Sequence, residues 1–238
     1  MTSFPFVPSG RFVAQYRDLS SGHLFVVARP ADAPDLWTTY LDGAMASYAA
    51  HGVESVLEYE SVVDGHSTAL FFAAIDPAGR VAGGMRVQGR YSAADEAHAL
   101  VEWAGRPGTE QLRGEIEVRL ADGVIEMKTG WVDDHAPKRH DLTNGLARIF
   151  VHAMELMGVR HAMGTVAQHA VPRWRTTGGV VSPGVVAVAY PTPDYQTVLM
   201  WWDRETFADL AVPEQLPLIM SERAQLAGRS FAAASVAS

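Results

Sequence analysis

Apolar and polar residues alternate along the chain with two periods, which predicts a mixture of helices and strands. Apolar side chains recur at a period near 3.6 from Asp35 to Gly52 and again over residues 142–157, where Gly158 ends the pattern, so we expect two helices there. Shorter runs that are rich in aromatic and β-branched residues predict strands. These strands are expected over residues 23–28, 68–75, 80–88, 124–132, 159–167, 185–190 and 197–202.

A β-hairpin is expected around the dipeptide Asp122-Gly123, which is favoured in two-residue hairpin turns. It would join residues 115–121 to residues 124–132 as antiparallel strands. In that register two pairs of opposite charge face each other across the strands, while the apolar side chains take the other face. The expected pairs are Arg119 with Glu126 and Glu117 with Lys128.

The elements follow one another without a repeat or a linker, so a single domain over residues 1–238 is expected. Residues 1–22 show no clear pattern and are expected to be irregular. Residues 204–238 predict a helical appendage that ends in an irregular tail from Gly228.

Composition narrows the classes of function. Acidic residues outnumber basic ones by 27 to 19, and the resulting net charge of −8 makes a nucleic acid a poor partner. The absence of cysteine excludes disulfides, a cysteine nucleophile and thiolate metal sites. The first residues lack the features of a secretory signal, and no apolar run is long enough to span a bilayer, so we expect a cytoplasmic protein.

No metal site is predicted, because the histidines lack the compact spacing that zinc ligands show. A serine-hydrolase elbow is also absent from the sequence. The histidines considered are His135, His140, His152, His161 and His169.

The start of the helix over residues 142–157 is a candidate anion site. A helix that follows a strand presents unpaired backbone N–H groups and the positive end of its dipole, which suit a phosphate. The alternative is a solvated loop with Asp141 as a simple helix cap. The cations and histidine expected in the loop are Lys138, Arg139 and His140, and the residues expected in the first helical turn are Thr143, Asn144 and Gly145.

Three stretches resemble the GNAT (N-acetyltransferase-like) superfamily, and more narrowly its branch of acyl-homoserine-lactone synthases and N-acyl amino acid synthases. Residues 81–86 (VAGGMR) resemble the third strand of that branch, and residues 124–127 (VIEM) resemble its strand with a central acidic residue. Residues 144–147 (NGLA) resemble the end of the GNAT pyrophosphate loop. The resemblance implies an α/β (α+β) fold in which helices flank a mixed, mostly antiparallel sheet that splays between residues 124–132 and 159–167.

The resemblance also implies a reaction. An acyl group would move directly from a coenzyme A or acyl-carrier-protein thioester to the amine of a small molecule, such as an amino acid, without a metal. Glu126 is the expected base, His169 a second candidate, and Arg86 a group that orients the acceptor or its own strand. The thioester would lie along the strand at Trp131 and Val132, with a backbone N–H as the donor to its oxygen. The phosphates of the donor would bind at Lys138, Arg139, Thr143, Asn144 and Gly145. The expected partners are the amine acceptor, an acyl-carrier protein and a second copy of the chain in a homodimer.

The sequence departs from the family pattern at three points. Leu142 replaces the usual Arg or Gln of the pyrophosphate loop, so Lys138 or Arg139 must supply that charge. Lys128-Thr129 replace the usual Ser-Arg, which argues against a homoserine-lactone product. Trp174 stands where many members have a tyrosine general acid, and an indole cannot deliver that proton. These departures keep open a second interpretation, in which a degenerate GNAT fold binds a thioester or a protein partner without catalysis.

Overall fold

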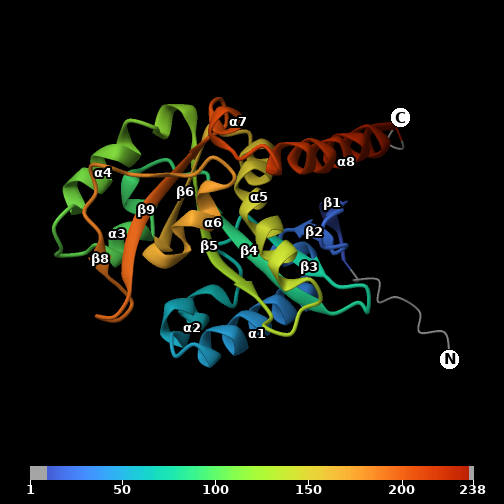
Figure 1. Ribbon diagram of the computed structural model, residues 1–238, viewed down its shortest axis with the longest axis horizontal. Coiled ribbons are helices and arrows are strands. Elements are labelled where there is room, and N and C mark those ends of the chain that lie inside the picture. The colour runs from blue at the N-terminus through green and yellow to red at the C-terminus, as the bar shows by residue number, and fades with distance from the viewer. Residues whose placement is uncertain (1–9, 236–238) are drawn as a thin grey trace. The chain divides into compact units, whose positions relative to one another are not determined.

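The computed structural model describes residues 10–235, with side chains to residue 227, and these residues form two compact units. Of the described residues, 10–86, 129–146 and 217–235 form the first unit, and 87–128 and 147–216 form the second. Strands β4 (Val81–Gly89) and β5 (Val124–Val132) and helix α5 (Arg139–Met157) each begin in one unit and end in the other (Figure 1). The prediction of a single domain stays a prediction.

The fold is α/β, with the mixed and mostly antiparallel sheet that the sequence predicted. The strand order is β1-β2-β3-β4-β5-β6-β9-β7, and β8 pairs with β9. Strands β5 and β6 form the parallel pair, whose register covers three residue pairs from Val124–His161 to Glu126–Met163. A parallel pair needs a crossover connection, and α5 supplies it.

The first unit begins with strands and a helix whose apolar faces meet. It contains β1 (Phe12–Arg17), β2 (Leu24–Ala28), β3 (Leu70–Ile75), the 3-10 turns η1 (Pro30–Asp32) and η2 (Glu54–Leu57), and the helices α1 (Pro34–Ala50), α2 (Tyr59–Val62) and most of α8 (Gln215–Ser235).

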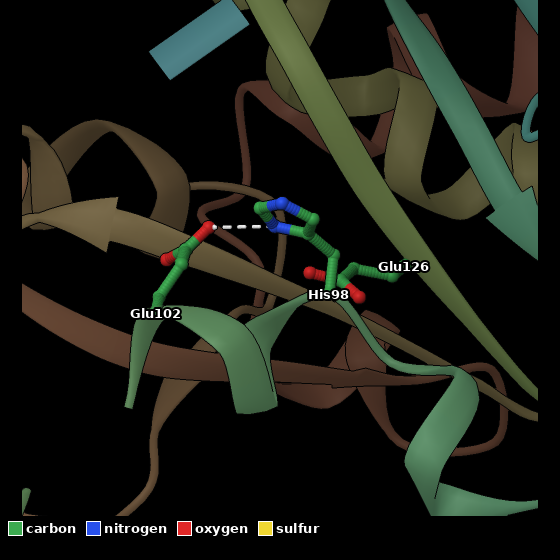
Figure 2. Close-up of side chains that lie close together, drawn as sticks. All are labelled: His98, Glu102 and Glu126. Atoms are coloured by element: carbon green, nitrogen blue, oxygen red, sulfur yellow. Dashed lines mark hydrogen bonds and ion pairs between the residues drawn. The ribbon is translucent and has the colours of Figure 1, made fainter. Parts of the chain in front are cut away.

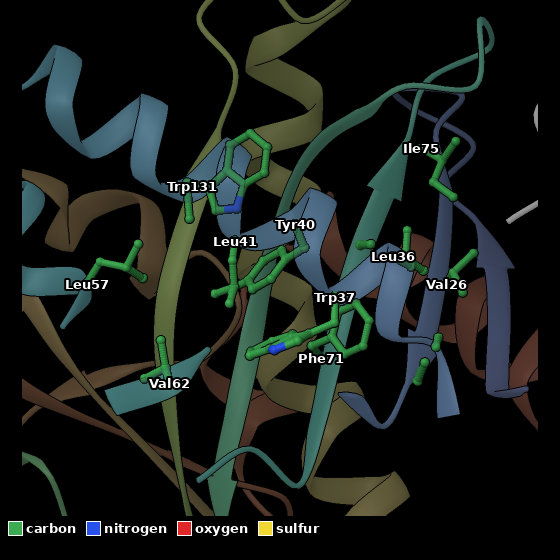
Figure 3. Packing of buried hydrophobic residues seen from close by; sticks show 14 residues of the cluster. Val26, Leu36, Trp37, Tyr40, Leu41, Leu57, Val62, Phe71, Ile75 and Trp131 are labelled. Atoms are coloured by element: carbon green, nitrogen blue, oxygen red, sulfur yellow. The ribbon is translucent and has the colours of Figure 1, made fainter. Parts of the chain in front are cut away.

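The core of the first unit lies where α1 packs on the sheet (Figure 3). Trp37 and Tyr40, three residues apart on α1, stack with ring centroids 5.4 Å apart, and the Trp37 ring meets Phe71 of β3 edge-on at 5.1 Å. Trp131 of β5 joins the same cluster, and its ring lies 6.2 Å from that of Tyr40. Large rings of this kind bury most apolar area per residue, so they hold α1 to the strands.

The second unit contains the remaining elements. They are η3 (Ala94–Glu96), α3 (Ala99–Glu102), α4 (Thr109–Glu117), η4 (Leu120–Asp122), β6 (His161–Ala167), η5 (Gln168–Ala170), α6 (Val171–Arg175), β7 (Val180–Val181), β8 (Val188–Ala189), β9 (Gln196–Asp203) and α7 (Phe207–Leu210).

Two aromatic clusters hold the second unit together. In one, Trp103, Leu112 and Leu199 are completely buried beside Met163. In the other, Phe150 of α5 stacks on Trp202 of β9 with centroids 3.7 Å apart, and it meets Trp174 of α6 edge-on at 5.4 Å. The indole N–H of Trp202 donates to Thr177 Oγ1 at 3.1 Å, so the ring's polar atom is satisfied inside the core.

The hairpin predicted around Asp122-Gly123 is wrong. Residues 109–117 form helix α4 and residues 120–122 a 3-10 turn, so only the second predicted strand exists, as β5. Leu112 and Ile116, four residues apart, are both completely buried, and this helical spacing outweighs the short alternation that suggested a strand. Val118, which the hairpin would have buried, is 75% exposed. The predicted pairs of Arg119 with Glu126 and of Glu117 with Lys128 do not form.

Three boundaries also differ from the predictions. Residues 12–17, expected to be irregular, form β1 and pair with β2. Helix α5 begins at Arg139 rather than after Asp141. Helix α8 continues to Ser235, past the expected tail at Gly228; residues 1–9 and 236–238 lie outside the described residues. No helix in the described part of the chain has the length and apolarity that crossing a membrane requires.

Gly43 gives a test of the first unit's core. Replacing glycine with alanine inside a helix ordinarily stabilises it by about 1 kcal/mol. A Cβ at Gly43 would lie 2.2 Å from the Trp131 ring, so we expect Gly43→Ala to destabilise the protein by about 1–3 kcal/mol. Gly114 of α4 has no heavy atom within 4 Å of its Cβ position, and Gly114→Ala is the matched control that should stabilise. Urea unfolding measures both; equal effects of the two substitutions would contradict the close packing at Gly43.

Candidate functional site

Glu126 lies near the middle of β5 and is completely buried. Its Oε2 accepts a hydrogen bond from the Tyr91 hydroxyl at 2.8 Å and one from the backbone N–H of Ala99 at 3.4 Å. Its Oε1 has no hydrogen-bond partner among the described residues, and the nearest charge is the Lys128 ammonium at 3.6 Å. One carboxylate oxygen is therefore fixed, and the other is available to accept a proton.

Lys128 connects Glu126 to a second buried carboxylate. Its ammonium, 7% exposed, donates to Glu102 Oε1, and Thr165 of β6 also donates to that oxygen at 3.2 Å. His98 lies four residues before Glu102 on the same side of the chain, and its Nδ1 is 3.3 Å from Glu102 Oε1 (Figure 2). Burial opposes ionisation of Glu102, but Lys128 and His98 outweigh it and lower the pKa of this carboxyl to about 2.

His98, Glu102 and Glu126 each place a possible ligand atom within 4.8 Å of the others, which is close enough to hold a metal ion. The Lys128 ammonium already contacts Glu102 and lies 3.6 Å from Glu126. A divalent ion between these groups would be repelled by that charge. The electrostatics therefore favour a lysine-centred cluster over a metal centre.

Thr129 adopts a strained backbone in the first unit. Its φ is +53°, a left-handed conformation that is rare for a β-branched residue. Buried groups hold it there: the Tyr40 hydroxyl donates to the Thr129 carbonyl at 2.6 Å, and Arg86 Nε donates to Thr129 Oγ1 at 3.1 Å. Burial raises the pKa of Tyr40 well above its ordinary value, so the phenol remains a donor.

Arg86 itself is 4% exposed, and its hydrogen-bond partners are two threonine hydroxyls, Thr129 and Thr68. No carboxylate among the described residues neutralises its charge. The sequence predicted that Arg86 orients either the acceptor or its own strand, and the structure shows that it contacts Thr129 of the neighbouring strand.

The predicted anion site lies at the start of α5 in the first unit. The first helical hydrogen bond runs from the Leu142 N–H to the Lys138 carbonyl, so the unpaired N–H groups of this helix end are those of residues 139–141. Thr143 is in the second turn and donates to the Arg139 carbonyl at 2.7 Å. Its predicted place in the first turn, with Asn144 and Gly145, is therefore wrong, because the helix starts three residues earlier than expected.

The two predicted phosphate cations are both exposed and both have protein partners. Lys138 has a left-handed φ of +49° and donates to the Ser20 carbonyl at 3.0 Å. Arg139 forms an ion pair with Asp134 at 2.8 Å, and both side chains are about half exposed (51% and 47%). Exposed pairs of this kind contribute about 0–1 kcal/mol, so a phosphate can displace the Asp134 carboxylate from Arg139 at small cost.

The remaining predicted site residues lie elsewhere. The Trp131 side chain is in the core of the first unit, and Val132 is 9% exposed beside Gly83 of β4. His169 is an exposed residue of η5, with its ring 6.2 Å from that of Tyr195, and it is not part of the Glu126 cluster. Trp174, which replaces the expected tyrosine acid, packs on Phe150.

Tyr91, His98 and Glu102 were not predicted from the sequence. All three come from residues 89–113, a stretch for which the sequence predicts no site residue. His98 and Glu102 are four residues apart on a helical segment, which is the spacing that places two side chains on one face, and this was the available signal. Nothing in the sequence connects Tyr91 to Glu126, because their contact depends on the tertiary fold.

Comparison with solved structures identifies the fold. The structure matches a coenzyme-A-dependent acyl-homoserine lactone synthase, BjaI, solved with MTA, with a TM-score of 0.56 and 16% identity over 79% of this chain and 88% of that one. It also matches FeeM, an N-acyl amino acid synthase from uncultured soil microbes, with a TM-score of 0.53 and 14% identity over 76% and 97% of the two chains. The chain therefore has the GNAT fold, as the sequence predicted.

Sequence comparison gives the family. The chain is 47% identical over 201 residues to the uncharacterized protein Rv1356c of Mycobacterium tuberculosis and, to the same degree, to the uncharacterized protein Mb1391c of Mycobacterium bovis. The match covers 84% of this chain and 76% of each relative. The chain belongs to the family of these mycobacterial proteins. No protein-family model matches it.

The low pKa of Glu102 predicts how stability depends on pH. A carboxyl whose folded pKa is lowered stabilises the protein above its unfolded pKa, and this contribution is lost as the pH falls toward the folded value. For Glu102 the interval runs from about 4.5 to about 2 and corresponds to about 3 kcal/mol. We expect Glu102→Gln to lower stability at neutral pH by about that amount and to flatten the acid side of the profile.

Urea unfolding between pH 7 and the lowest pH at which the protein stays folded measures this effect. The exposed Glu214 is the control, and Glu214→Gln should leave the profile as in the native chain. A Glu102→Gln profile parallel to that of the native chain would show that the buried pair has no such effect.

Proposed function

We propose that this protein is an N-acyltransferase that moves an acyl group from a coenzyme A or acyl-carrier-protein thioester to the amine of a small molecule, with an amino acid as the preferred class of acceptor. The observation that carries the proposal is the Glu126 carboxylate, which is completely buried and has one oxygen fixed by Tyr91 and the other free to accept a proton. The fold, shared with an N-acyl amino acid synthase, supports the same reaction class.

The chemistry requires few groups. The amine nitrogen attacks the thioester carbonyl carbon, the C–S bond breaks, and the sulfur leaves as a thiolate that solvent protonates. The proton lost by the amine passes to Glu126. Because Glu126 has no exposed surface, a water molecule carries that proton, and the Lys128 ammonium stabilises the carboxylate until it arrives.

Features of the first unit support binding of the donor. The N-terminus of the 19-residue helix α5 offers unpaired N–H groups at residues 139–141, together with the cations Lys138 and Arg139. This combination suits the pyrophosphate of coenzyme A. Trp131 and Val132 remain the proposed strand contacts of the thioester arm. The second turn of α5 also remains part of the proposed site, with Thr143, Asn144 and Gly145.

Arg86 supports an acceptor that carries a carboxylate. It is a buried cation whose described partners are neutral hydroxyls, so an anionic group would complete its electrostatic environment. An amino acid supplies both the amine and such a carboxylate.

A second function has a specific observation in its favour. Lys128 is paired with both buried carboxylates, and a paired carboxylate is a weak base. On that basis the fold would bind a thioester or a partner protein without turnover. A thioester-binding fold of this kind agrees with the first function on coenzyme A binding and differs from it on catalysis.

Replacing Glu126 separates them. We expect Glu126→Gln to lower turnover of acyl-coenzyme A and amino acid mixtures by about 10²–10⁴-fold, because the proton acceptor is lost, while coenzyme A binding is unchanged. The chain has no cysteine, so a thiol reagent detects only released coenzyme A. Glu214→Gln is the control. Thiol release at the native rate from the Glu126 variant would remove this residue from the mechanism, and no release by the native chain with any acyl donor would favour binding alone.

Substitutions of Arg139 and of Asp134 should change the affinity for coenzyme A in opposite directions, which tests the donor site. Titration calorimetry with coenzyme A should show binding about 3–10-fold weaker for Arg139→Gln, because a charge-assisted contact to phosphate is lost. Binding should be tighter for Asp134→Asn, because the competing carboxylate is removed. The partly exposed Arg113, which pairs with Asp95 in the second unit, is the control position. Shifts of the same sign in the two variants would place the phosphates elsewhere.

A further inference from the structure

The second unit contains a pocket of about 360 Å³ that none of the predicted site residues lines. Its walls come from α4 and the segment after it, the first residue of β6, strands β7 and β9, and helix α7. This volume falls in the range of small-molecule sites. The residues on which the argument depends are Glu115, Arg119, His161, Ser182, Trp201 and Leu210.

The pocket has an aromatic wall with a cation over it. The Arg119 guanidinium carbon lies 4.4 Å from the centroid of the Trp201 ring. The His161 ring meets the same indole edge-on, with centroids 6.4 Å apart. Leu210, which is 52% exposed, adds an apolar side chain to the wall. The guanidinium carbon lies over the indole face, and the N–H groups of Arg119 that have no hydrogen-bond partner in the described residues are left for a ligand.

The two acidic side chains in the pocket already have partners. Glu115 Oε1 accepts from the Ser182 hydroxyl at 2.6 Å, and Oε2 accepts from the Trp201 indole N–H at 2.8 Å. Asp203, also in the lining, is held by Arg160 at 2.8 Å and by the Glu205 N–H. Each of these carboxylate oxygens already accepts at least one hydrogen bond, so a ligand amine would compete with the protein's own donors.

The donors of the pocket are not all occupied. Within the described residues, Arg119 makes one hydrogen bond, from Nη1 to the Glu115 carbonyl at 2.7 Å, and the same nitrogen forms an ion pair with Glu115 Oε2 at 4.0 Å; four of its five N–H groups therefore have no hydrogen-bond partner. The His161 ring nitrogens lie 3.9 Å from Asp122 and from Asp203, beyond hydrogen-bond distance. Burial lowers the pKa of His161, so at neutral pH it is an uncharged ring with one N–H.

We propose that this pocket binds a small monocarboxylate with a flat apolar body, such as an arylcarboxylate, with its carboxylate on Arg119 and its body against Trp201 and Leu210. The excess of free donors over free acceptors favours an acceptor-rich anion over an amine or an alcohol. A guanidinium edge binds a carboxylate through two parallel hydrogen bonds, and the indole supplies a flat apolar contact for the rest of the ligand. The site does not depend on acyl transfer.

Benzoate, benzyl alcohol and benzylamine test the proposal because they share a ring and differ in the polar group. The Trp201 indole N–H is followed by ¹H–¹⁵N NMR in the full-length protein, and a Trp201→Phe spectrum assigns its signal. We expect benzoate to shift this signal in a saturable way. The affinity for benzyl alcohol and for benzylamine should be at least tenfold weaker than the affinity for benzoate. No saturation with benzoate, or equal binding of benzyl alcohol or benzylamine, overturns the proposal.

The Arg119→Met variant tests the assigned cation. It keeps the apolar stem of the side chain, and benzoate affinity should fall at least tenfold. Arg113→Met on α4 is the control, since Arg113 is as exposed as Arg119 but does not line the pocket, and it should bind benzoate as the native chain does. Unchanged affinity in Arg119→Met overturns the assignment. If Arg119→Met fails to fold, Arg119→Lys replaces it, since a point charge without the planar edge should still weaken benzoate binding.

Discussion

One ammonium group organises the polar interior of the second unit. Lys128 is 7% exposed and contacts Glu102 while lying 3.6 Å from Glu126, and both carboxylates are almost without solvent contact. Leaving either carboxylate in that interior without a cation would be costly, since an uncompensated buried charge destabilises a protein by about 3–5 kcal/mol. The position of α3 against β5 therefore depends on this lysine, and so does any chemistry at Glu126.

The charge balance of the cluster gives the two carboxylates different roles. One ammonium faces two carboxylates, and its contacts with them differ. Glu102 is held ionised by its contact with Lys128 and by His98, and its pKa is about 2. Glu126 lies farther from the Lys128 ammonium than Glu102 does, and one of its oxygens has no hydrogen bond within the described residues. The proposed base would accept the proton on this oxygen.

Elements that depend on contacts between residues close in sequence could be predicted, and contacts between residues far apart in sequence could not. The helix at α5 and the strands β2, β3, β5, β6 and β9 follow from periodicity, which records burial on one face of each element. The prediction of a hairpin around Asp122-Gly123 was wrong because Gly123 follows a 3-10 turn there. The same dipeptide therefore occurs in a different local structure. Glu126 was found from its resemblance to a family pattern.

The partners of Glu126 could not be found in that way. Tyr91 lies 35 residues away in sequence, and Lys128 was assigned to a strand pair that does not exist. The start of α5 was placed three residues late because Asp141 resembles a cap, whereas the helix begins after the left-handed Lys138. That error moved Thr143, Asn144 and Gly145 into the wrong turn.

Strand β5, which carries Glu126 and Lys128, also contains the strained residue Thr129. A β-branched residue at φ +53° costs about 1–3 kcal/mol, and such strain persists only where neighbouring groups impose it. Here Tyr40 and Arg86 impose it from the buried side of the first unit, through the carbonyl and the hydroxyl of one residue. A left-handed residue interrupts the regular geometry of a strand, and Trp131 and Val132, the proposed contacts of the thioester arm, lie two and three residues after Thr129 on β5. The residues that hold Thr129 in place therefore stabilise this part of the strand without having to touch a substrate.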